Sequence, residues 1–226
     1  TYSIYEPLYQ YHFLERPYRL IPRSAAEVVK PVYLDKDGKD LPETASAEEI
    51  ALSVYEIPIK KGILFAPHPA FAKNEKGEYI NHALAPEVID ELHNPMDLPQ
   101  KGTRELTAIK RMANPRIIAP VYGTMVNYLP GLKDFAVQVR AEDKRLRADL
   151  KPSDRDLPFL DLRKFELKGV SAPDKYTLRL EVKGKYPQFP NWLAMTFFAP
   201  VPWEAEAFYA QKGMAKNNLS LNYWPV

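Results

Sequence analysis

Two segments of the chain alternate apolar and polar residues closely enough to predict β-strands. In residues 53–60 the apolar side chains of Tyr55, Ile57 and Ile59 recur at every second position. This period of two puts them on one face of a half-buried strand. Residues 176–182 repeat the pattern. A chain with two such strands must build at least one sheet, and this requirement limits its fold more than any other feature of the sequence.

Both strands are expected to belong to one sheet although they lie far apart in the sequence. The side chains expected to point into their shared core are Tyr55, Ile57, Ile59, Leu178 and Leu180. Pro58 has no N–H to donate to a β-ladder. The first strand is therefore expected either to lie at the edge of the sheet or to turn the nitrogen of Pro58 away from any partner strand.

Helices are predicted at few places. Residues 86–92 and 202–211 both begin on proline, and Glu204 lies near the positive end of the second helix dipole. The densely charged stretch Ala141–Asp161 predicts a solvated connection or an exposed helix face. Few helices among scattered strands indicate an α+β fold, with a small mixed sheet and a few helices in one piece over residues 1–226.

The segment Tyr2–Leu20 is crowded with aromatic residues. Aromatic side chains bury more area than any others, so the segment predicts packing against a neighbouring layer. A surface on which a ligand stacks is the alternative.

Composition narrows the classes of partner. The chain has 31 Lys and Arg against 29 Asp and Glu, a net charge of +2, which does not suggest a nucleic-acid partner or a polybasic membrane patch. It has no Cys, so disulfides, thiolate metal sites and cysteine nucleophiles are excluded. No stretch approaches the roughly 18 apolar residues of a membrane span. The 22 Pro against 9 Gly indicate stiff connections rather than flexible linkers.

No residue pattern in the chain predicts catalysis. The four histidines are not spaced for a helical metal pair, and neither a nucleophile elbow nor a glycine-rich phosphate loop is present. His68, between Pro67 and Pro69, is expected to have a structural role with its ring bonded to the backbone. The chain is therefore expected not to be an enzyme and to need no metal or cofactor. A carbohydrate-active enzyme domain with paired carboxylates beside aromatic platforms stays open as the alternative.

Several motifs, in a fixed order, resemble those of the family 5 extracellular solute-binding proteins, the oligopeptide- and dipeptide-binding proteins of ABC importers. They are Ile4–Leu8, Lys61–Phe65 after the first strand, Thr107–Pro115, Gly169–Val182, Pro187–Pro202 and Asn222–Val226. Each motif is weak alone, but together they cover nearly the whole chain.

The resemblance implies that this chain is a fragment, mainly the α+β subdomain of the first of two lobes, with the second lobe absent. Such a protein captures peptides or similar solutes by hinge closure of its lobes and delivers them to an ABC permease. It is expected in the periplasm or elsewhere outside the cytoplasm, with or without a lipid anchor, and as a monomer. Tyr122 falls where relatives have a tyrosine that can reach the ligand, with core packing as the alternative. The fragment alone is expected to bind no peptide tightly.

One position departs from the family pattern. In relatives a Thr-Ala pair begins a helix, but only Ile109 and Lys110 separate Ala108 from Arg111 here. About half a dozen residues are therefore expected to be missing between Ala108 and Ile109, as a break in the chain. A natural deletion with a rebuilt helix start is the alternative.

Overall fold

The computed structural model describes residues 6–98, 116, 119, 121–151 and 153–225. Its strands are β1 (Tyr9–Tyr11), β2 (Leu20–Pro22), β3 (Val32–Leu34), β4 (Asp40–Leu41), β5 (Leu52–Pro58), β6 (Val170–Asp174) and β7 (Thr177–Lys183). Its α-helices are α1 (Pro86–Glu91), α2 (Tyr122–Tyr128), α3 (Leu132–Leu146), α4 (Phe189–Trp192) and α5 (Trp203–Tyr209). The short 3-10 helices are η1 (Pro69–Phe71), η2 (Pro95–Asp97), η4 (Leu162–Lys164) and η5 (Thr196–Phe198). The predicted α+β class is confirmed.

The chain divides into two compact units, each formed from segments that are distant in sequence. The first unit comprises Thr1–Lys61, Thr107–Val139 and Leu162–Pro200, and the second comprises Gly62–Leu106, Arg140–Asp161 and Val201–Val226. That residues 1–226 form a single piece of a larger protein stays a prediction. The expected break between Ala108 and Ile109 lies outside the described residues.

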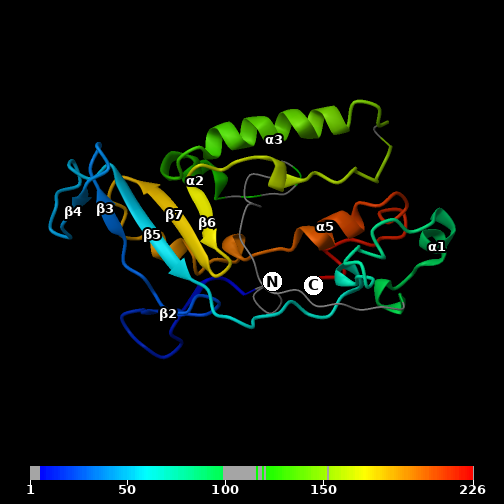
Figure 1. Ribbon diagram of the computed structural model, residues 1–226, viewed down its shortest axis with the longest axis horizontal. Helices are drawn as coiled ribbons and strands as arrows, with labels where there is room; N and C mark the ends of the chain where they lie inside the picture. Colours follow the sequence, from blue (N-terminus) through cyan, green and yellow to red (C-terminus); the bar gives the residue numbers. More distant parts are fainter. Residues whose placement is uncertain (1–5, 99–115, 117–118, 120, 152, 226) are drawn as a thin grey trace. The chain divides into compact units, whose positions relative to one another are not determined.

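The first unit is built on a five-stranded antiparallel sheet in the order β4-β3-β5-β7-β6. Figure 1 shows β5 and β7 side by side, as the register requires: Tyr55 pairs with Leu180, and Ile57 with Leu178. All four side chains are buried. The predicted shared core is confirmed, except that Ile59, beyond the end of β5, is only half-buried.

The prediction that Pro58 marks an edge strand is wrong, because β5 has β3 on one side and β7 on the other. The alternative, a nitrogen that faces no partner, is wrong as well. The N–H of Ile59 donates to the carbonyl of Tyr176, next to β7, and successive backbone N–H groups of a strand point to opposite sides. The nitrogen of Pro58 therefore faces the β3 side. There the pairing with β3 extends only from Leu52 to Val54, but Ala26 donates its N–H to the carbonyl of Pro58 at 2.7 Å and Ala25 forms a β-bridge with Ile59.

Helix α3 begins within the first unit. It buries Leu132, Phe135, Ala136 and Val139, which recur at the three- and four-residue spacing of one helix face. The later part of α3 carries the exposed ion pair of Arg145 with Glu142, 2.7 Å between nitrogen and oxygen. The charged stretch from residue 141 thus starts as a solvated helix end, as predicted.

The aromatic N-terminal segment forms the two-stranded antiparallel sheet β1-β2. Tyr9 is fully buried, and its N–H donates to the carbonyl of Leu193 at 3.2 Å. The prediction of aromatic packing is correct for Tyr9 but wrong for Tyr11, Phe13 and Tyr18, which are exposed. The reason is that these three lie in or beside the turn between the two short strands, where no second layer of described residues covers them.

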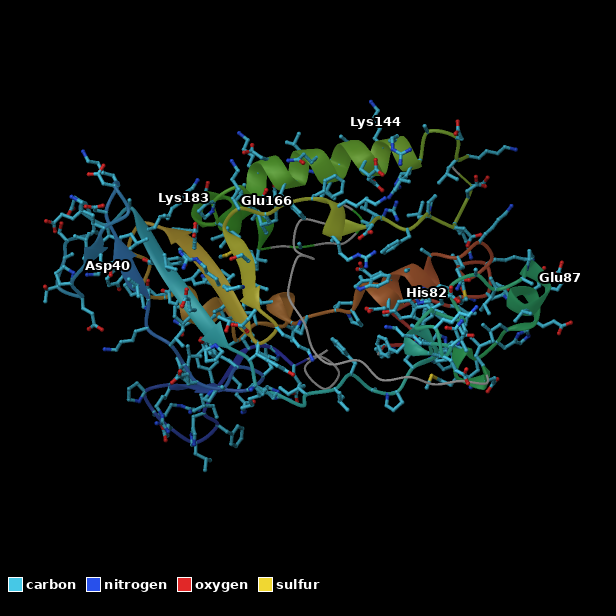
Figure 2. The ribbon with its side chains drawn as sticks, in the orientation of Figure 1. Asp40, His82, Glu87, Lys144, Glu166 and Lys183 are labelled. Carbon is cyan, nitrogen blue, oxygen red and sulfur yellow. The ribbon has the colours of Figure 1, made fainter. Side chains whose placement is uncertain are left out.

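The second unit contains the two predicted helices. Helix α1 begins at Pro86 as expected and buries Ile89, while Glu87 points outward near its start (Figure 2). Helix α5 begins at Trp203, with Pro202 as its N-cap residue, and packs against η1. Among the described helices, none combines the length and apolar character that crossing a bilayer requires.

Candidate functional site

A buried polar cluster around His68 holds η1 against α5. The Nδ1 atom of His68 accepts the N–H of Ala70 at 3.1 Å, and its Nε2 lies 2.8 Å from the hydroxyl of Tyr209. That hydroxyl donates to the carbonyl of Trp224 at 3.0 Å, so Nε2 must donate to the tyrosine oxygen. These bonds assign His68 as the neutral tautomer protonated on Nε2. Its expected structural role, with the ring bonded to the backbone, is confirmed.

Protonation of His68 is unfavourable for two reasons. The side chain is only 2% exposed, and burial lowers its pKa to about 4. A second proton would also have to reside on Nδ1, which faces the N–H of Ala70 and would lose that bond. His68 is thus a neutral hydrogen-bonding group at physiological pH.

A second buried cluster surrounds Glu204, the residue expected only to complement the α5 dipole. The carboxylate is fully buried, and the hydroxyl of Tyr79 donates to its Oε1 at 2.8 Å. The ring of Tyr79 stacks on His82, labelled in Figure 2, at 4.6 Å between centroids. The sequence carried a signal for this burial, because Glu204 lies four residues before the buried Phe208 and so shares its helix face.

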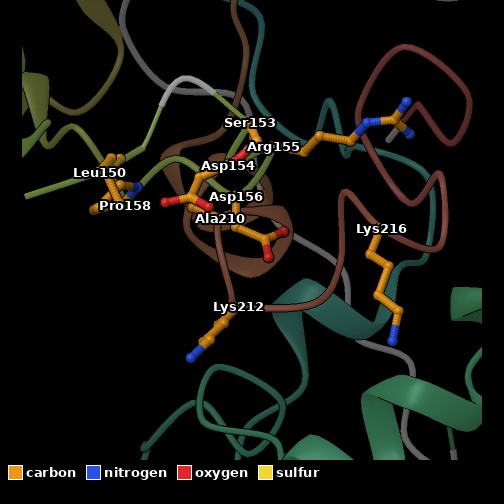
Figure 3. A pocket seen from close by; sticks show the side chains of 9 residues that line it. All are labelled: Leu150, Ser153, Asp154, Arg155, Asp156, Pro158, Ala210, Lys212 and Lys216. Carbon is orange, nitrogen blue, oxygen red and sulfur yellow. The ribbon is translucent and has the colours of Figure 1, made fainter.

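The second unit also contains a pocket of about 760 Å³. One wall is the segment after α3, and the other is the segment that follows α5 (Figure 3). The lining residues are Leu150, Ser153, Asp154, Arg155, Asp156, Pro158, Ala210, Lys212 and Lys216. The pocket therefore combines a few apolar side chains with charges of both signs.

Asp156 fastens the two walls together. Its Oδ2 accepts the N–H of Gly213 at 2.9 Å, and its Oδ1 accepts the N–H of Ala215 at 3.1 Å. Bonds from backbone donors to a carboxylate are charge-assisted and stronger than neutral ones. Gly213 has a φ of 100°, a left-handed backbone conformation that glycine adopts without strain. Asp156 therefore fixes the shape of the pocket and has both oxygens engaged.

The remaining charges of the pocket differ in how far they are already paired. Lys216 forms an ion pair with Asp90 at 3.2 Å, and Asp154 accepts the N–H of Lys151 at 2.8 Å. In the part of the chain that the structure describes, Arg155 and Lys212 make no ion pair or side-chain hydrogen bond. Figure 3 shows Arg155 extending from one wall and Lys212 from the other. The pocket therefore has one cation on each wall that forms no ion pair with the described residues.

Tyr122, the residue singled out for ligand contact, is the first residue of α2 and is half-buried. It belongs to the first unit, whereas every lining residue of the pocket belongs to the second. Its contact with a ligand therefore stays a prediction. The sequence did not predict the pocket, because its two charged walls lie more than fifty residues apart and meet through Asp156. The sequence of either wall alone looks like that of an ordinary solvated surface segment.

The described residues include no candidate metal centre. No group of three or more His, Asp or Glu side chains among them could hold a metal ion. The pocket, the His68 cluster and the Glu204 cluster all lie in the second unit. No family model, curated protein or solved structure matches the chain.

Proposed function

We propose that this chain is part of the substrate-binding component of an ABC transporter. It captures peptides or similar solutes outside the cytoplasmic membrane and delivers them to a permease. The observation that carries this proposal is the pocket of about 760 Å³. Its volume lies within the roughly 300–1,000 Å³ of small-molecule sites.

The lining of the pocket suits a solute that has a carboxylate and short side chains. Arg155 and Lys212 offer their charges to the carboxylate, while Leu150, Pro158 and Ala210 offer apolar contact. A short peptide carries both kinds of group.

The positions of the sequence motifs also support the proposal. Lys61–Phe65 directly follows the central strand β5, and Gly169–Val182 coincides with the hairpin β6-β7. These two motifs therefore lie in or next to strands of the five-stranded sheet.

Binding rather than catalysis is proposed because the pocket does not supply a paired acid and base. Of its two carboxylates, Asp156 uses both oxygens to hold the backbone of residues 213 and 215. A glycosidase-type mechanism needs two carboxyl groups that are both available to the substrate. The alternative of a carbohydrate-active enzyme therefore receives no support from this site.

Titration with trialanine, followed by NMR or calorimetry, tests the proposal on the chain as it stands. We expect weak binding, with Kd above about 10 µM, because a solute held by a single lobe keeps much of its surface in water. Replacing Arg155 and Lys212 together by glutamine should weaken binding at least about fivefold, the effect of losing an exposed ion pair worth roughly 1 kcal/mol. C-terminally amidated trialanine lacks the carboxylate, so it should bind the unaltered chain as weakly as free trialanine binds the double variant.

The matched control replaces Lys36 and Lys133, exposed lysines of the first unit, by glutamine and should leave Kd unchanged within about twofold. The proposal fails if trialanine at 10 mM, on the order of a thousand times the expected lower limit of Kd, produces no signal. Equal binding of free and amidated peptide, or hydrolysis of the peptide, would count against it as well.

A further inference from the structure

The turn between β1 and β2 displays a group of large apolar side chains to solvent. Within this turn and its flanks, residues 11–19, here called the hairpin tip, Phe13 is 88% exposed and Leu14 is 78% exposed. Tyr18 and Tyr11 beside them are 66% and 42% exposed. Contiguous apolar patches of a few hundred square ångströms mark interaction sites on soluble proteins.

The hairpin tip is held in shape by its own side chains. The guanidinium of Arg16 lies 4.0 Å from the ring centroid of Tyr18, and the rings of Tyr11 and Tyr18 meet edge to face at 5.9 Å. The Nη1 atom of Arg16 also donates to the carbonyl of Glu15 at 2.8 Å. The turn that exposes Phe13 and Leu14 is therefore stabilised by contacts among its own residues.

The charge of the hairpin tip is positive after internal pairing. Glu15 accepts a hydrogen bond from the Nη2 atom of Arg19 at 2.7 Å, which compensates one charge of each sign. Arg16 has no acidic partner among the described residues and makes contact with carbonyls and the Tyr18 ring. The tip thus combines two protruding apolar side chains, two amphipathic tyrosines and one uncompensated cation.

We propose that the hairpin tip inserts into an anionic lipid surface. Phe13 and Leu14 enter the acyl boundary, Tyr11 and Tyr18 lie at the level of the headgroups, and Arg16 contacts lipid phosphates. Aromatic residues of this kind favour the interface between water and membrane, and each Arg near an anionic surface adds to binding. The inference goes beyond the proposed function and does not depend on any solute.

The size and shape of the tip favour lipid over a protein partner. The four exposed side chains offer roughly 500 Å², since a large aromatic side chain has about 150–250 Å². A stable protein interface buries about 800 Å² on each partner. A bilayer imposes no such minimum, because it surrounds the protruding side chains on all sides.

Co-sedimentation of the chain with vesicles tests this proposal, using phosphatidylcholine alone and phosphatidylcholine mixed with phosphatidylglycerol. The unaltered chain should bind the mixed vesicles at millimolar lipid, with an association constant no higher than about 10⁴ M⁻¹, the value for one myristoyl chain. Phe13→Ser with Leu14→Ser should reduce binding about a hundredfold, since each of the two large apolar side chains withdrawn from water contributes about tenfold or more. Arg16→Gln should cost about fivefold on mixed vesicles and little on phosphatidylcholine.

The matched control is Leu64→Ser with Val137→Ser, because each of these side chains is 58% exposed outside the hairpin tip. This control should bind vesicles within about twofold of the unaltered chain, the scale of about ±0.5 kcal/mol that neutral surface changes have. The conservative variant Phe13→Leu keeps a large apolar side chain and should retain binding. Thermal melting of each variant confirms that the fold is intact. The proposal is overturned if the unaltered chain does not sediment with mixed vesicles, or if the hairpin-tip and control variants lose binding equally.

Discussion

Replacing Ile57 with alanine is expected to lower the free energy of unfolding by about 2–5 kcal/mol, the usual cost of emptying a buried aliphatic site. Ile57 is fully buried near the end of β5, opposite Leu178 of β7. Because the side chain has no exposed surface, its truncation leaves a cavity in the core. Urea denaturation followed by circular dichroism measures the change.

Val137→Ala is the control for Ile57→Ala. Val137 lies on α3 and is 58% exposed, so its truncation should change stability by no more than about 0.5 kcal/mol. Similar losses for the two variants would contradict the assignment of β5 and β7 to the main core. A loss at Ile57 below about 1 kcal/mol would contradict it too.

Acidification from pH 7 to pH 4 is expected to destabilise the chain by about 3 kcal/mol through His68 alone. In the unfolded state this histidine has its ordinary pKa of 6.5, whereas burial lowers the pKa to about 4 in the folded state. Between these values the unfolded state binds more protons than the folded state, so stability falls as pH falls through this window. The difference between the two pKa values sets the size of the effect.

His68→Gln separates this effect from other titrations. Glutamine keeps a hydrogen-bonding side chain but takes up no proton, so the variant should be less stable at pH 7 and lose less stability between pH 7 and pH 4. The remaining loss comes from groups such as His82, whose pKa is also lowered by burial. It also comes from Asp174, whose pKa is lowered chiefly by the backbone N–H of Tyr176. Urea midpoints at several pH values provide the comparison, and equal pH dependence in both proteins would refute the role of His68.

The helices and strands predicted correctly from the sequence are those whose residue pattern lies within one short segment. Strands β5 and β7 follow a period of two. Helix α1 begins at Pro86 and α5 directly after Pro202, each with an acid in its first turn. The pairing of β5 with β7 was also correct, since two half-buried apolar rows in one small domain have few other surfaces to cover. Pro58 was harder to place, because a proline at the end of a central strand has the same sequence signature as one at an edge.

The candidate site was much less predictable, because it depends on contacts between distant segments. Asp156 lies in a stretch read as solvated, and only its bonds to Gly213 and Ala215 give it a structural role. In the hairpin tip the sequence predicts burial that the structure does not have. Large apolar side chains favour burial, yet Phe13 and Leu14 are exposed because of the turn that carries them. Composition alone does not distinguish a core cluster from a displayed one.

Photo-crosslinking tests most directly whether the pocket is the solute-binding site. A tripeptide with a free carboxylate and a benzoylphenylalanine side chain is irradiated with the chain, and mass spectrometry locates the adducts. The proposed function predicts adducts within residues 150–158 and 210–216, the two walls joined by Asp156, and competition by trialanine. Adducts confined to other segments, or adducts in the walls that excess trialanine does not reduce, would contradict it.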